Sequence, residues 1–89
     1  GFGNPEPVFA THGVMVEDAR LIGQNGKHLK LRITNNESGI TRDAVAFGMG
    51  ALHNQLQRGS TIDIAYTIDM NTWNGKRSLQ LKVKDIHCL

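Results

Sequence analysis

Two short segments of the chain combine positive charge with rings that can stack on a flat ligand. One covers residues 27–34, which hold three basic side chains and no acidic one, and the other follows the tryptophan at position 73. Their members are Lys27, His28, Lys30, Arg32, Trp73, Lys76 and Arg77. Proteins that hold single-stranded nucleic acid use cations for the phosphates and aromatic rings for the bases. We therefore expect the cations to contact phosphates, and Trp73 and His28 to stack on bases.

The same residues also have a simpler interpretation, as a solvated strand face with Trp73 packed against its own hairpin. Strands with basic residues on the outward side are common, so charge alone does not separate the two interpretations. The position of both segments in the predicted fold favours binding. No residue pattern indicates that base edges are recognised, so we expect binding that is largely independent of sequence.

No pattern in the chain indicates catalysis or a metal site. The histidines at positions 12, 28, 53 and 87 are scattered, and Cys88 has no second cysteine to pair with. The serines at 38, 60 and 78 lie in no nucleophile motif. Residues 48–53 imitate the start of a dinucleotide-binding motif but lack its third glycine. We therefore expect a chain with no catalytic residue, metal or cofactor of its own.

The composition is that of one small globular domain. The chain has 89 residues, 39% of them hydrophobic, and a formal net charge of +2, which is too apolar and too weakly charged for a disordered chain. The longest stretch without strongly polar residues, 44–52, is far short of the ~20 residues that span a bilayer. The single cysteine and the lack of an export signal favour the cytoplasm, and the missing initiator methionine suggests a piece of a larger protein.

Alternation of apolar and polar residues with a period of two indicates strands through most of the chain. The predicted strands cover residues 13–23, 27–34, 41–47, 61–70 and 76–86. Asn-Gly pairs at 25–26 and 74–75 predict tight hairpin turns, and a change of face near Asp18 predicts a bulge. In the fourth strand we expect Ile62, Ile64, Tyr66 and Ile68 to be buried, and we assign Phe47 to the core as well.

One short helix is expected between the third and fourth strands. Met49, Leu52 and Leu56 lie on one side of such a helix, within residues 48–56. The order β-β-β-α-β-β predicts an all-β fold, a five-stranded OB-fold Greek-key barrel with one short helix between strands three and four. We assign residues 1–12 to an N-terminal arm and residues 13–89 to the barrel. In this fold, strands two and three and the loops 1–2 and 4–5 bind oligonucleotides or oligosaccharides, and both basic segments fall there.

Four motifs, in order and spacing, resemble the RecJ family of bacterial exonucleases. They are residues 1–9 (GFGNPEPVF), 26–31 (GKHLKL), 43–50 (DAVAFGMG) and 71–81 (NTWNGKRSLQL). The resemblance spans nearly the whole chain. It implies the OB-type domain that follows a DHH-type catalytic core in a longer enzyme, which degrades single-stranded DNA from the 5′ end with manganese or magnesium.

The resemblance also implies how this chain works in its parent enzyme. The aspartate-rich metal motifs of the family are absent here, so no catalytic residue is carried over to this sequence. The implied partners are single-stranded DNA, the catalytic core, and, in DNA repair and recombination, a helicase and a single-stranded-DNA-binding protein. The implied location is the bacterial cytoplasm, with no membrane contact. The alternative is a scaffold or protein-docking domain of the same enzyme that does not bind DNA.

Overall fold

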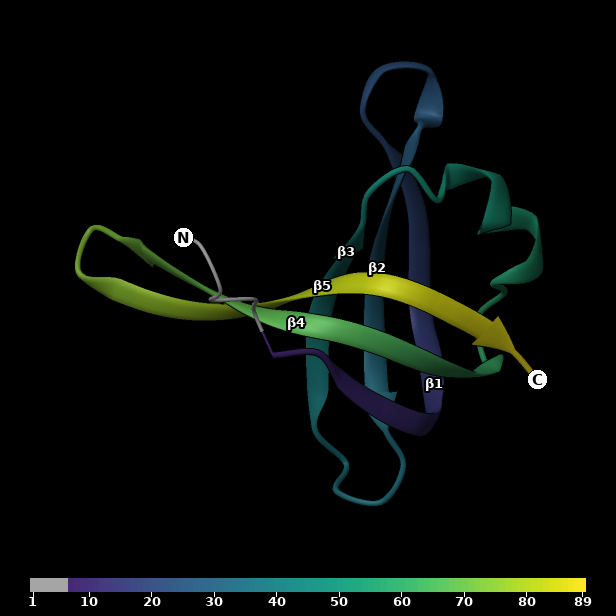
Figure 1. The fold of residues 1–89 in the computed structure, drawn as a ribbon, viewed down its shortest axis with the longest axis horizontal. Helices are drawn as coiled ribbons and strands as arrows, with labels where there is room; N and C mark the ends of the chain where they lie inside the picture. Colours follow the sequence, from purple (N-terminus) through teal and green to yellow (C-terminus); the bar gives the residue numbers. More distant parts are fainter. Residues whose placement is uncertain (1–6) are drawn as a thin grey trace.

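The chain folds into a closed barrel of five strands, and the hairpin of the last two strands extends far to one side of it (Figure 1). The computed structural model describes residues 7–89, apart from the side chains of Asn71 and Trp73. Around the barrel the strands follow the order β1-β2-β3-β5-β4, and all neighbours are antiparallel except β3 and β5, which are parallel. This topology confirms the predicted OB-fold barrel. The elements are β1 (Phe9–Ile22), η1 (Gln24–Gly26), β2 (His28–Asn35), β3 (Thr41–Ala46), η2 (Gly50–Gln55), β4 (Thr61–Trp73) and β5 (Lys76–Cys88).

The barrel interior is filled by alternate residues of all five strands. Leu29, Leu31 and Ile33 of β2 are each at most 3% exposed, while the polar residues between them face outward. Period-two alternation therefore predicts the inward face of this strand correctly. Leu56, which follows η2, is also buried against this core.

The first strand begins at Phe9, earlier than the predicted start at residue 13. Residues 9–12, which the sequence assigns to the arm, belong to β1 instead, and residues 9–11 pair with β4. The register then shifts between Thr11 and Val14, around Gly13 with its positive φ of 72°. A second shift, between Val16 and Asp18, confirms the predicted bulge. The two bulges bend β1 so that it bridges β4 and β2 and closes the barrel.

The β4–β5 hairpin is longer than the sequence predicts. Trp73 pairs with Lys76, and only Asn74 and Gly75 form the turn, both with positive φ. This two-residue turn has the form that Asn-Gly favours. The expected 4–5 loop is thus mostly strand, and the hairpin extends well beyond the barrel wall (Figure 1).

Residues 50–55 form a 3₁₀ helix, η2, where the sequence predicts a short helix. Gly50 is buried where η2 approaches the β1–β2 turn, and its N–H donates to the Lys27 carbonyl at 2.9 Å. A Cβ at this position would overlap the Gly26 carbonyl oxygen, so only glycine fits without movement of the backbone. Within residues 7–89, neither helix is long and apolar enough to cross a membrane.

Candidate nucleic-acid interface

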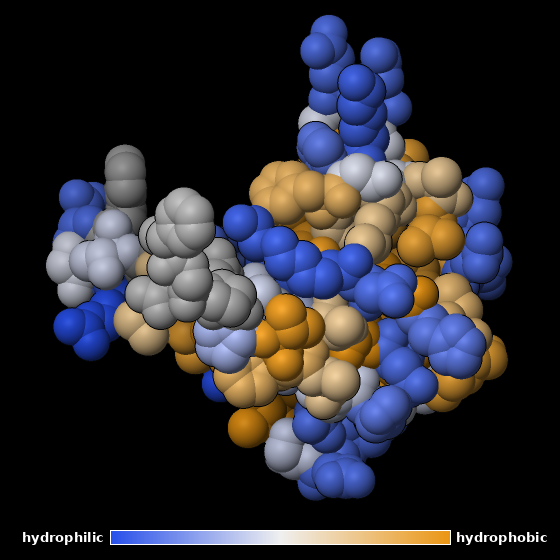
Figure 2. All heavy atoms as spheres, in the orientation of Figure 1, coloured by the Kyte–Doolittle hydropathy of each residue, from blue (hydrophilic) through white to orange (hydrophobic). Residues whose placement is uncertain are grey.

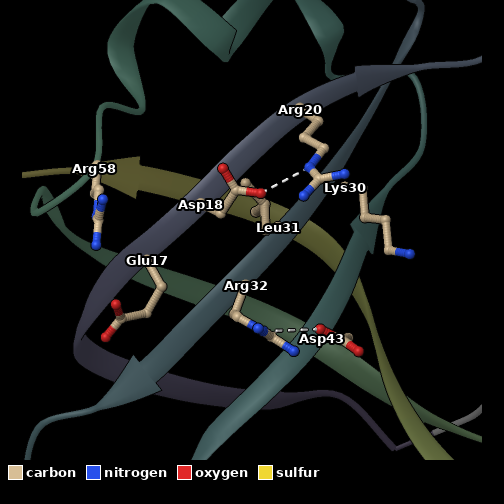
Figure 3. A pocket seen from close by; sticks show the side chains of 8 residues that line it. All are labelled: Glu17, Asp18, Arg20, Lys30, Leu31, Arg32, Asp43 and Arg58. Carbon is tan, nitrogen blue, oxygen red and sulfur yellow. Dashed lines mark hydrogen bonds and ion pairs between the residues drawn. The ribbon is translucent and has the colours of Figure 1, made fainter.

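A charged depression lies on the outward face of β1, β2 and β3 (Figure 3). It has a volume of about 500 Å³, and most of its lining is ionic. The residues that line it are Glu17, Asp18, Arg20, Lys30, Leu31, Arg32, Asp43 and Arg58. Basic and acidic groups are therefore mixed here, and their pairing decides which cations can meet a phosphate.

Two of the arginines in this depression are paired with aspartates. Arg20 Nε lies 2.8 Å from Asp18 Oδ2, and Arg32 Nε lies 3.5 Å from Asp43 Oδ1. The hydrogen bond from Arg20 lowers the pKa of Asp18, and the same bond raises the pKa of Arg20. Both pairs are well exposed to solvent, so they contribute little stability. The two aspartates do, however, offset the positive charge that Arg20 and Arg32 would otherwise offer a phosphate.

Two of the predicted site residues, Lys30 and Arg32, line this depression, and Lys30 takes part in neither of the two ion pairs. Its side chain extends away from both pairs (Figure 3) and is exposed. In the register of the sheet Lys30 lies beside Val45 of β3, and Val45 lies beside Lys82 of β5. These residues form one row across three neighbouring strands. The row places two lysines on the outward side of the barrel.

An exposed phenylalanine lies next to this row. Phe47 is 55% exposed, and its ring centroid lies 5.3 Å from that of His28 in an edge-to-face arrangement. Lys82 Nζ lies 6.0 Å from the centroid of the Phe47 ring, at the outer limit of a cation–π contact. We call His28, Phe47 and Lys82 the Phe47 cluster. It joins a ring open to solvent with a cation, which is the combination that a stacked base and its phosphate require.

The backbone on either side of the cluster holds it in place. The Gly48 N–H donates to His28 Nδ1 at 2.8 Å, so the neutral His28 ring carries its proton on Nε2. The Gly50 N–H binds the carbonyl of Lys27, the residue before His28. These two bonds tie the chain after β3 to the start of β2 and thereby orient the Phe47 ring.

The structure assigns the other predicted site residues to two separate places. Lys27 is exposed at the end of the β1–β2 turn, whereas Lys76 and Arg77 are exposed near the tip of the projecting hairpin. Figure 1 shows this tip well away from the β1–β2 turn. The two basic segments therefore do not form one patch. The side chain of Trp73 lies outside the described residues, so its stacking stays a prediction.

The prediction that Phe47 lies in the core is wrong, because its side chain is exposed, and Lys82 is not among the predicted site residues. Residues 44–47 are all apolar, so their alternation does not show which side is inward. In the barrel Ala44 and Ala46 are fully buried and the larger Phe47 points outward. The signal that could have found Lys82 is the parallel pairing of β3 and β5, which brings Lys82 beside Val45, two residues before Phe47.

A third group of titratable residues lies at the start of β4. Asp63 Oδ2 is 3.2 Å from His12 Nδ1 and 3.8 Å from His87 Nδ1. The backbone N–H of Gly13 donates to Asp63 Oδ1 at 2.9 Å, and this bond, with that of His12, lowers the pKa of Asp63. Across the part of the chain that the structure describes, no group of three or more potential ligands has the geometry to hold a metal ion.

The closed barrel with its basic and aromatic outward face defines an OB-fold domain, a class that binds oligonucleotides or oligosaccharides. Residues 1–85 match the family model described as the RecJ OB domain. The chain belongs to the RecJ OB-domain family, which confirms the resemblance of its motifs.

Curated relatives carry this domain within much longer chains. The single-stranded-DNA-specific exonuclease RecJ of Bacillus subtilis is 36% identical over 85 residues, which are 96% of this chain and 11% of that protein. The RecJ of Haemophilus influenzae is 37% identical over 86 residues, which are 93% of this chain and 14% of that protein. The chain therefore spans only 11–14% of the length of these relatives.

Solved structures show the same fold. RecJ from Thermus thermophilus, in complex with Mg²⁺, matches with a TM-score of 0.64 at 27% identity, over 96% of this chain and 12% of that one. The SSB domain of a Synechococcus protein matches with a TM-score of 0.74 at 12% identity, over 98% of this chain and 99% of that one. At 12% identity the second likeness supports the fold alone.

Proposed function

We propose that this domain binds single-stranded DNA across the outward face of β2, β3 and β5. The observation that carries the proposal is the Phe47 cluster, an aromatic ring 55% open to solvent with a lysine ammonium at its face. One base stacks on Phe47, and Lys30 and Lys82 hold the phosphates on either side of it. The curated relatives are named as single-stranded-DNA-specific exonucleases, which supports DNA as the ligand.

The chemistry of the face favours a single strand over a duplex. A ring that stacks on a base needs that base unpaired and turned outward, which duplex DNA does not offer. Every base has a flat face, so we expect affinity to depend weakly on sequence. The Arg32–Asp43 pair lies on the same face and limits the number of free cations. The isolated domain should therefore bind weakly.

We infer that the parent protein is a 5′-3′ single-stranded-DNA exonuclease in which this domain guides the strand to the catalytic core. The Mg²⁺ in the Thermus thermophilus RecJ structure supports metal-dependent chemistry in the rest of such a chain. We assign manganese or magnesium to that DHH-type core and not to this domain. We further propose DNA repair and recombination in the bacterial cytoplasm as its setting, with a helicase and a single-stranded-DNA-binding protein as partners.

The direct test is fluorescence anisotropy of a labelled oligo-dT titrated with this domain. Phe47→Ala should weaken binding by about 1–3 kcal/mol, the range measured for loss of one base–aromatic stack. Leu21→Ala is the matched control, because Leu21 is a hydrophobic side chain of similar exposure, 48%, that lies outside the Phe47 cluster. The control should bind as the wild type does.

Two results would contradict the proposal. Equal affinity in the Phe47→Ala and wild-type domains would remove Phe47 as the stacking ring. A folded domain with no affinity for oligo-dT at low salt would favour the scaffold alternative. The single tryptophan of the chain adds an independent readout. Quenching of its fluorescence by unlabelled oligo-dT would report stacking at Trp73, and Trp73→Ala should then weaken binding by a similar amount.

A further inference from the structure

The inward, apolar face of the barrel continues onto the projecting hairpin, where no described element covers it. Ile68 pairs with Leu81 across the hairpin, and Met70 pairs with Leu79 one step further out. Leu81 is 9% exposed inside the barrel, whereas Ile68, Leu79 and Met70 are 46%, 37% and 56% exposed. Directly paired residues share a face of an antiparallel ribbon. These three residues therefore form a continuous apolar strip, which we call the hairpin strip.

An apolar groove lies at the base of this strip. Its volume is about 230 Å³, and Ile68, Leu79, Ile40 and Tyr66 are among the residues that line it. Phe9 packs against Tyr66 with ring centroids 5.9 Å apart and is itself 43% exposed. Figure 2 shows hydrophobic residues gathered at the base of the hairpin. More than half of the large hydrophobic side chains that the described residues expose lie in the strip and around this groove.

The surroundings of the strip differ from those of a nucleic-acid site. The cross-strand pairs Ile68–Leu81 and Met70–Leu79 contain no cation. Within residues 7–89, basic residues flank the apolar area at its two ends, with Arg42 beside the groove and Arg77 beyond Leu79. An apolar centre with a polar rim is the pattern of a protein interface. The rim charges select a partner whose own rim is acidic.

We propose that the hairpin strip and its groove dock against another domain of the same, longer polypeptide, through an apolar surface with acidic residues at its edge. The relatives place this domain in chains of which it is only 11–14%, so a large covalently linked partner is present in each. The chain also enters the domain beside the strip, because Pro7 and Phe9 line a second small depression together with Ile68. The first described residues of the chain therefore lie at this surface. The inference rests on family membership and not on DNA binding.

Oxidation of Met70 gives a direct test in the intact protein. Exposed methionine thioethers are converted to the sulfoxide by dilute hydrogen peroxide, at a rate that follows their accessibility. The sulfoxide is quantified by peptide mass spectrometry in the 89-residue chain and in the full-length polypeptide that contains it. Met15 and Met49 are partly buried in the barrel and serve as internal references for its fold. We expect Met70 to oxidise about tenfold more slowly in the full-length protein, with the two references unchanged.

A matched pair of variants localises the effect. In the full-length protein Leu79→Lys adds a charge to the strip and should restore rapid oxidation of Met70, with Met15 as evidence that the barrel is intact. Leu21→Lys adds the same charge at a similarly exposed residue of β1, 48% against 37%, and should leave Met70 protected.

Three outcomes would overturn the inference. One is equal oxidation rates of Met70 in the short and full-length chains. A second is protection in the short chain that rises with its own concentration, which would assign the strip to a second copy. The third is protection of the short chain by oligo-dT, which would make the strip part of the DNA surface. Failure of the Phe47→Ala test would leave the Met70 comparison unaffected, so the two proposals fail separately.

Discussion

The Phe47 cluster and the hairpin strip both expose hydrophobic side chains, yet they differ in what surrounds those side chains. Phe47 lies beside a histidine ring and a lysine ammonium, on a backbone anchored by Gly48. Met70 and Leu79 lie beside further apolar residues on a ribbon that extends away from the barrel. The identity of the neighbours, rather than exposure itself, separates a nucleic-acid surface from a protein interface.

The two surfaces also lie on opposite faces of β5. Leu79 and Leu81 belong to the inward side of this strand, whereas Lys82 belongs to the outward side. Because successive residues of a strand alternate between faces, one strand can serve both surfaces. A domain of this size can therefore hold DNA on one side and a protein on the other. A substitution on one surface should therefore leave the other surface unchanged, and a substitution outside both should change only the stability of the fold.

The largest effect is expected at Gly50, on which the anchoring of the Phe47 cluster depends. Gly50→Ala would force the backbone of η2 away from the β1–β2 turn, because the new Cβ overlaps the Gly26 carbonyl oxygen. We expect a loss of about 2–4 kcal/mol in the free energy of unfolding, measured by urea denaturation. The folded fraction should also lose oligo-dT affinity, whereas oxidation of Met70 should not change.

Gly39→Ala is the control for this substitution. Gly39 also has a positive φ, 72°, but nothing lies within 4 Å of a Cβ placed there. It should cost only about 1 kcal/mol, from backbone strain. If both variants lose the same stability, the contact between η2 and the β1–β2 turn is not what holds this region.

Charge reversal on the outward face is expected to have the next largest effect. Lys30→Glu with Lys82→Glu should weaken oligo-dT binding on the order of 100-fold at low salt and reduce the salt dependence by about two released ions. Lys76→Glu with Arg77→Glu changes the same charge at the hairpin tip. Anisotropy at several salt concentrations compares the two. A larger loss from the hairpin-tip pair would move the DNA path from the barrel wall to the hairpin.

A smaller effect is expected at Thr67, which pairs with Lys82 on the outward side of β4. Thr67 is 2% exposed, and its hydroxyl is buried without a hydrogen-bond partner among the described residues. Thr67→Val removes the unpaired hydroxyl and should raise the free energy of unfolding by about 1 kcal/mol without changing oligo-dT affinity. Thermal melts, with the exposed Thr61→Val as control, test this. A loss of stability would show that the hydroxyl is satisfied in solution.

The smallest effect concerns Asp63, which belongs to neither surface. Its pKa is lowered by the Gly13 N–H and by His12, so its ionised form stabilises the fold. That contribution is complete above the usual carboxyl pKa of 3.8 and is lost as the pH falls through the lower folded value. Melting temperatures recorded from pH 5 downward should therefore fall less steeply for Asp63→Asn than for the wild type. An equally steep fall in the Asp63→Asn variant and the wild type would contradict this expectation.

Alternation and turn chemistry were enough to predict the barrel. The clear contrast between Leu29, Leu31 and Ile33 and their polar neighbours fixed the inward face of β2. The Asn-Gly pairs marked both hairpin connections, and each has positive φ at two successive positions. Only the pair at 74–75 forms the predicted two-residue turn, because residues 23–27 connect β1 and β2 through the 3₁₀ helix η1. Together these signals predicted the order of elements along the chain, β-β-β-α-β-β, which is that of the OB-fold.

The candidate site was less predictable, because its key residues depend on three-dimensional context. Ile68 continues the alternation of β4, and we expected it to be buried. It is exposed because, among the described residues, the pairing of β1 with β4 ends at Phe9 and Tyr66. Nothing local in the sequence marks where one strand stops covering another. Nor does any local signal mark the ion pair between Arg32 and Asp43, so Arg32 was predicted to be a free cation.

The projecting hairpin also sets how the length of this domain can change during evolution. Beyond Tyr66 and Leu81 the described pairing of β4 and β5 is with each other alone, so the tip can be shortened or extended while the barrel stays intact. The Asn74–Gly75 turn, however, must follow a hydrogen-bonded pair, and such pairs recur at every second residue of each strand. Natural insertions and deletions here should therefore come as two residues in each strand, placed symmetrically about the turn. The hairpin would then act as a spacer with discrete lengths.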